Sequence, residues 1–146
     1  MLDKKLVSLH KHWLAADAIQ QVVAIHIDDS HELAGDLLRF AKYHSMFQRL
    51  SVWYALIYVV VEGYKELQYV DTKIDRLLSR DDLVNNLRLF RNATFHYQKA
   101  PVSEKVLKFL TLEEGQAWVH ELHVSFEEFF IAQLPIEQTL NQLRKA

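Results

Sequence analysis

The residues most able to perform chemistry lie between Arg91 and Tyr97, where a guanidinium, an amide and an imidazole fall within six residues. An imidazole changes its charge near neutral pH and acts as a general acid or base. An arginine holds two oxygens of a phosphate and stabilises charge that develops in a transition state. With Arg91, Asn92 and His96 as catalytic residues, the segment predicts metal-independent cleavage of RNA, in which the 2′-hydroxyl attacks the neighbouring phosphorus.

Helix geometry limits how these groups can meet. In a regular helix Asn92 and His96 lie about one turn apart on the same face. Arg91 and His96 are five residues apart, so they diverge by about 140° around the axis. Three arrangements would bring them together: a swing of the long Arg91 side chain, a helix that loosens near His96, or two copies of the segment meeting across a dimer axis.

The surroundings of the segment are basic. Residues 76–108 contain seven lysines or arginines and three acids, although the whole chain has a formal net charge of −2. A local positive excess attracts anions, and we expect substrate contacts from Arg88, Tyr97 and Lys99. The alternative is a solvated face that happens to be basic.

The composition indicates one folded domain. The chain has 146 residues, of which 50% are hydrophobic and 25% charged, and it contains only three glycines and two prolines. Such a chain favours long helices joined by short loops. The absence of cysteine excludes disulfides, thiolate metal sites and a cysteine nucleophile. The small net charge argues against a strongly basic nucleic-acid-binding domain.

No targeting or membrane segment is expected. The first residues lack the apolar core of a signal peptide. The most apolar stretch, residues 52–61, is about half of the roughly 20 residues that a membrane-spanning helix needs. We therefore expect a cytoplasmic protein with no membrane contact.

Apolar spacing predicts three helices in the first half of the chain. Apolar residues recur at three- and four-residue steps over residues 2–27. Asp29, with Glu32 three residues later, predicts a cap for a second helix that bends near residues 43–45. Residues 47–67 are apolar nearly all round, which is typical of a central buried helix.

The second half is predicted to hold shorter elements. Residues 71–78 form a short helix or turn, and Ser79 caps the helix that carries the Arg–Asn–His segment, with Asp82 three residues later. Residues 102–110 follow Pro101 as a loop or short helix.

Thr111 and Glu114 have the spacing of a further capping box, which would open a helix that ends before Pro135. Residues 136–143 form a short terminal helix or a tail. The sum is a single all-α antiparallel bundle of about five helices, one domain over residues 1–146. Its parts are the N-terminal helices (1–46), the central and motif helices (47–100) and the C-terminal helices (101–146).

The motif and the architecture together resemble a known family. An arginine, a polar residue and then a histidine four to six residues after the arginine, late in a helical bundle, resemble the signature of HEPN domains (higher eukaryotes and prokaryotes nucleotide-binding). The resemblance implies a fold that is usually dimeric, with the motif of both protomers lining a cleft. It implies Arg91 and His96 as the catalytic pair and Asn92 as the polar position.

The resemblance also implies a function. Many members are metal-independent endoribonucleases of toxin–antitoxin and defence systems, act without a cofactor, and in some cases pair with a nucleotidyltransferase-type antitoxin. Many active toxins have a tyrosine two residues after the histidine, whereas here Tyr97 follows directly and Gln98 occupies that place. Other members are non-catalytic modules that bind a nucleotide, RNA or a protein partner.

Purely structural roles are the alternative for the same residues. Arg91 would then pair with an acid such as Asp82 or Glu62, and His96 would cap a helix C-terminus. The protein would be a dimerisation module or scaffold. The sequence leaves these readings open.

A metal site is the remaining candidate. His120 and His123 lie three residues apart on one predicted helix, with Glu127 a turn further, and would need a ligand from another helix to hold a metal. We favour a helix whose polar face contains two histidines, and expect no metal. A larger aromatic set is expected in the core: Trp13, Trp53, Tyr54, Tyr58, Trp118, Phe126, Phe129 and Phe130.

Overall fold

The protein is an all-α bundle, as the sequence predicts. The computed structural model describes residues 3–25, 35–100 and 103–145. Within these residues there is no strand, and there are seven helices rather than about five. They are α1 (Lys4–Val22), α2 (Gly35–Glu66), α3 (Thr72–Leu78), α4 (Asp81–Phe95), α5 (Glu104–Leu110), α6 (Gly115–Gln133) and α7 (Ile136–Lys145).

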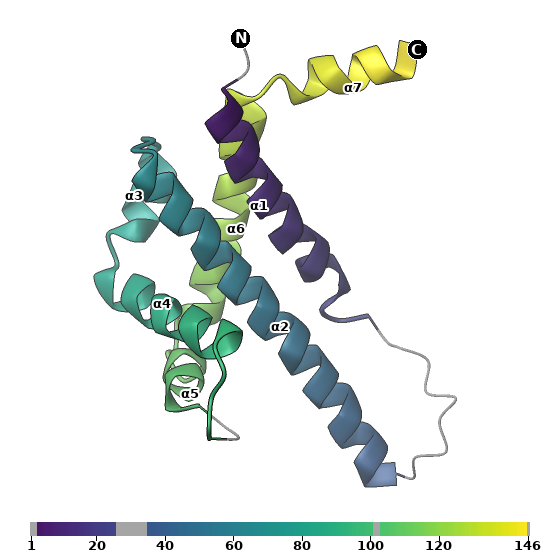
Figure 1. Ribbon diagram of the computed structural model, residues 1–146, viewed down its shortest axis with the longest axis vertical. Coiled ribbons are helices and arrows are strands. Elements are labelled where there is room, and N and C mark those ends of the chain that lie inside the picture. The colour runs from purple at the N-terminus through teal and green to yellow at the C-terminus, as the bar shows by residue number, and fades with distance from the viewer. Residues whose placement is uncertain (1–2, 26–34, 101–102, 146) are drawn as a thin grey trace.

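Helix α2 is the element on which α1 and α4 pack. It runs without interruption for 32 residues, with α1 along one side and α4 along the other (Figure 1). The predicted bend near residues 43–45 is therefore wrong, and the segment before it joins the central helix. The predicted cap at Asp29 lies outside the described residues. None of the described helices has the length and apolar character needed to cross a membrane.

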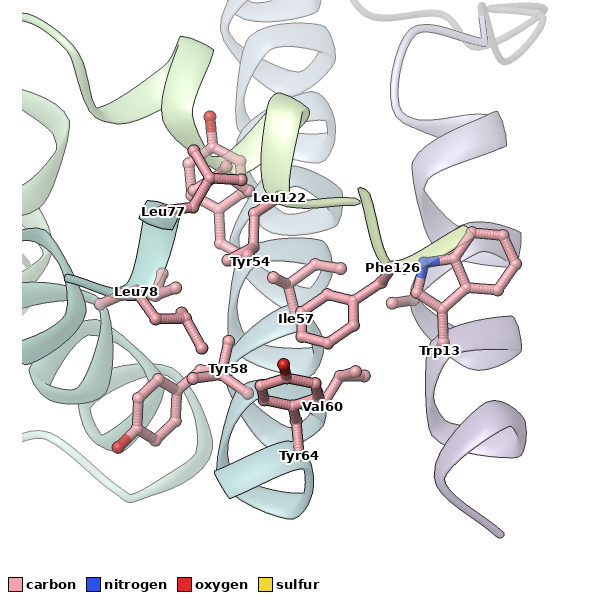
Figure 2. Close-up of a cluster of buried hydrophobic side chains, with 14 of the residues drawn as sticks. Trp13, Tyr54, Ile57, Tyr58, Val60, Tyr64, Leu77, Leu78, Leu122 and Phe126 are labelled. Carbon is pink, nitrogen blue, oxygen red and sulfur yellow. The ribbon is translucent and has the colours of Figure 1, made fainter. Parts of the chain in front are cut away.

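The core is built from the predicted aromatic residues, all eight of which are buried. Figure 2 shows side chains of α1, α2, α3 and α6 converging, with Phe126 beside Ile57 and near Trp13. Tyr64 meets Phe126 edge to face, with ring centroids 5.6 Å apart. Such pairs contribute about 0.5–1.5 kcal/mol beyond the burial of their area. The aromatic content therefore stabilises the bundle.

Two predicted helix starts are wrong in the same way. Ser79 is the C-terminal cap of α3, where its hydroxyl donates to the Arg76 carbonyl at 2.6 Å. Thr111 likewise ends α5 and donates to the Leu107 carbonyl at 2.9 Å. A hydroxyl between two consecutive helices can serve either one, and here it satisfies the preceding carbonyls. Helices α4 and α6 consequently begin without a side-chain cap hydrogen bond.

The end of α2 contains the one described non-glycine residue with positive φ, Gln68 at 58°. Its amide donates to the Lys65 carbonyl at 3.1 Å, and the Tyr69 amide donates to the Tyr64 carbonyl at 3.3 Å. This pair of bonds forms a Schellman motif, whose left-handed position is usually glycine. The Gln68 Cβ makes that conformation costly, by roughly 1 kcal/mol.

Replacing Gln68 with glycine is expected to raise the free energy of unfolding by about 0.5–1 kcal/mol, because it removes the Cβ strain at the turn. Urea unfolding at 25 °C measures the change. Gln68→Ala is the matched control, since it keeps the Cβ and should give no gain. Equal stability of the glycine and alanine variants would show that the Cβ of Gln68 does not strain this turn.

Candidate functional site

Helix α4 ends one residue before the histidine of the motif. Phe95 is its last residue, and His96 has extended backbone angles (φ −107°, ψ 146°) while its amide still donates to the Asn92 carbonyl at 3.0 Å. The Gln98 side chain donates to the carbonyls of His96 and Tyr97, both at 3.2 Å. These bonds satisfy carbonyls that the helix no longer uses. The helix therefore ends before His96, as one of the three predicted arrangements requires, but this ending does not bring His96 together with Arg91.

Arg91 is engaged by α2. Its Nη1 lies 2.9 Å from Glu62 Oε2, and its Nε donates to Asn92 Oδ1 at 2.9 Å. The guanidinium carbon sits 4.8 Å from the centroid of the Tyr58 ring, a cation–π contact. The alternative in which Arg91 pairs with Glu62 is thus confirmed. Asn92 orients Arg91 rather than the imidazole.

The pKa of Tyr58 reflects burial and the charges around this contact. Burial raises its pKa above the ordinary value, the Glu62 carboxylate raises it further, and the charges of Arg91 and Arg88 act in the opposite direction. Arg88 therefore belongs to the same cationic surface as Arg91. It is exposed, and its Nη2 donates to Asn85 Oδ1 at 2.9 Å.

Much of the basic excess is compensated within the fold. Arg80 bridges Asp82 at 3.1 Å and Glu114 at 2.6 Å, and Arg76 lies 3.7 Å from Glu121. Exposed pairs like these contribute little to stability. They do reduce the positive field that the charge count of residues 76–108 predicts.

His96 lines a groove of about 740 Å³, within the roughly 300–1,000 Å³ typical of small-molecule sites. Its walls come from α2, the end of α4, the segment that follows it, and α5. The lining combines imidazoles, carboxamides and hydroxyls with a few apolar side chains. It consists of His44, Phe47, Gln48, Ser51, Ala93, Thr94, His96, Gln98, Ala100, Ser103 and Val106.

The structure divides the predicted site in two. Arg91 and Asn92 contact each other against α2, and neither is among the groove-lining residues described. His96 and Gln98 line the groove. Tyr97 is 90% exposed and does not line the described groove, so its position next to His96 does not bring it to the same surface.

Lys99 is also exposed and lies outside the described lining. The groove's α2 wall, from His44 to Ser51, was not predicted as part of the site. These residues are remote in sequence from the motif, and no local pattern connects them to it. Only the packing of α4 against α2, with α5 packed on α4, brings them together.

His123 is the buried polar centre of the bundle, with 4% of its surface exposed. The Trp53 indole donates to its Nδ1 at 3.1 Å, and its Nε2 lies 3.0 Å from Asp17 Oδ1. An indole nitrogen only donates, so Nδ1 accepts and the imidazole proton resides on Nε2. Trp13 donates to the backbone carbonyl of the same residue at 3.1 Å.

This arrangement leaves no ring nitrogen of His123 for joint chelation with His120 and Glu127. His120 is exposed whereas His123 is buried, so the two histidines do not share a face. In the described parts of the chain no group of three or more histidine, aspartate or glutamate side chains could hold a metal. The sequence could have predicted that His123 is buried, because His123 follows Val119 by four residues and therefore lies on the apolar face of α6.

His123→Ala is expected to lower the free energy of unfolding by about 2–4 kcal/mol, because it leaves the Trp53 indole and the Asp17 carboxylate without their buried partner. Urea unfolding followed by tryptophan fluorescence measures it. His120→Ala on the same helix is the control and should change stability by less than about 0.5 kcal/mol. Equal effects of the two substitutions would refute the role of His123.

Compared with models of protein families, with characterised proteins and with solved structures, the chain matches none. The likeness to HEPN domains therefore depends on the Arg91-to-His96 motif and on the all-α architecture.

Proposed function

We propose that this chain is a HEPN-like, metal-independent endoribonuclease of the toxin or defence type, acting in the cytoplasm, with His96 transferring protons. The supporting observation is the position of His96, an exposed imidazole at the end of α4 that faces a groove of about 740 Å³. An acid–base group needs both access to substrate and a fixed backbone position. The end of a packed helix supplies both.

Arg91 has a more restricted role in this proposal. Within a single chain, Glu62 compensates the charge of Arg91, and Arg91 is not among the described residues that line the groove. It binds phosphate when an RNA phosphate displaces Glu62, or when a second copy presents its own Arg91. The homodimer and a nucleotidyltransferase-type antitoxin, both implied by the resemblance, form part of the proposal. Arg88 and Lys99, both exposed, are the proposed additional phosphate contacts.

The decisive variant is His96→Ala, assayed on RNA in the presence of a chelator. The wild type should cut and leave 2′,3′-cyclic phosphate and 5′-hydroxyl ends. The variant should be slower by about 10²–10⁴-fold, the usual contribution of a positioned acid–base group. His120→Ala, an exposed histidine on α6, is the matched control and should cut like the wild type. Equal rates for the wild type and His96→Ala, or loss of wild-type cutting with the chelator, would overturn the proposal.

The second candidate is a non-catalytic module that binds RNA or a nucleotide. The observation that favours it is the separation of Arg91, which lies against Glu62 and Tyr58, from His96, which lines the groove, because a phosphate held by Arg91 would then not face the imidazole. Such a module should bind a labelled oligoribonucleotide without cutting it. Arg91→Ala should abolish that binding in fluorescence anisotropy, with Arg76→Ala, which is paired with Glu121 on the α6 side, as the control. Unchanged binding by Arg91→Ala would exclude this candidate.

A further inference from the structure

We propose that His44 is the second acid–base group of the site, so that one chain contains a two-imidazole centre in the groove between α2 and the end of α4. This inference rests on the proposed ribonuclease function and deepens it. It names a catalytic residue that belongs to no part of the Arg91-to-His96 motif. It also replaces the need for a second chain at the proton-transfer step.

The chemistry of RNA cleavage requires two proton transfers at opposite sides of the phosphorus. One group removes the proton of the 2′-hydroxyl, and another donates a proton to the departing 5′-oxygen. Arg91 stays charged and Asn92 does not titrate, so neither completes the set. Among the described lining residues of the groove, His44 and His96 are the side chains that carry an imidazole, the usual acid–base group of proteins.

The continuous helix α2 is what places His44 there. Residues 44, 47, 48 and 51 all line the groove, and their spacing of three and four residues is that of a single helical face. A bend at residues 43–45 would turn His44 away from this face. His96 lines the same groove from the segment that follows α4.

The rest of the lining fits a nucleotide. Phe47, Ala93 and Val106 give the groove an apolar surface against which a base can lie, and an aromatic ring adds stacking. Gln48 and Gln98 supply amide groups that can bond to the edge of a base or to a phosphate oxygen. Because no described lining residue is an acid, nothing in the lining repels the phosphate.

Several described charged side chains near the groove do not line it. Arg49 on α2 donates to carbonyls at the end of α1, including that of Ile25 at 3.1 Å. Lys99, Glu104 and Lys105 are next in sequence to lining residues and are exposed outside the lining. Within the described lining, the two imidazoles are therefore the groups to which the proposal assigns proton transfer.

The step balances with these two groups alone. The neutral imidazole takes the 2′-hydroxyl proton as the 2′-oxygen forms its bond to phosphorus. The bond from phosphorus to the 5′-oxygen breaks, and the protonated imidazole donates its proton to that oxygen. The products are a 2′,3′-cyclic phosphate and a 5′-hydroxyl, and exchange with water restores the starting protonation of both histidines.

The test is the pH dependence of cleavage of a short oligoribonucleotide by the full chain, with chelator, between pH 4.5 and 8.5. The wild type should give a bell-shaped profile. His44→Ala and His96→Ala should each slow cleavage by at least about 10²-fold and each should remove a different limb of the bell. His120→Ala should retain both limbs.

One result would overturn the proposal while sparing the proposed function: a His44→Ala rate and pH profile equal to those of the wild type. His44→Gln serves as a second variant should the alanine variant fail to fold. Absence of cleavage by the wild type would instead refute the ribonuclease function. In that case, the protein is titrated with inorganic phosphate and the imidazole NMR signals are followed to test whether the groove binds phosphate. Shifts of both the His44 and His96 signals support the two-imidazole site, and unshifted signals overturn it.

Discussion

One buried imidazole joins three helices of this bundle. The imidazole of His123 on α6 accepts a hydrogen bond from the Trp53 indole of α2, and its other nitrogen faces the Asp17 carboxylate of α1. The backbone carbonyl of His123 accepts a hydrogen bond from the Trp13 indole. Buried polar groups are costly unless they are paired. Each of these groups therefore constrains where the others can lie. The alignment of α1 and α6 on α2 follows, and with it the placement of every surface that α2 presents.

Helix α2 then serves two chemically different surfaces. Near its C-terminal end, Glu62 and Tyr58 hold Arg91 through charge and ring contact. Further toward its N-terminus, the face that begins at His44 forms a wall of the groove that receives His96. Arg91 and His96 are five residues apart, yet they belong to different surfaces because α4 carries the first and has ended before the second.

Apolar periodicity was sufficient to predict the helices and their buried aromatic residues, because burial of one face repeats with the helical period. Details at helix ends were less predictable. Ser79 and Thr111 have the composition of N-terminal caps but serve the preceding helices. The expected bend at residues 43–45 is absent from α2, and His44 lies along the wall of a groove rather than at a break.

By itself, the sequence determined the all-α class and the aromatic core, because both depend on the local period of a helix. Tertiary structure alone selected Glu62 rather than Asp82 as the partner of Arg91, buried His123, and brought His44 to the groove of His96. These contacts join residues on different helices. Their distances depend on how helices pack against one another, which no local pattern encodes.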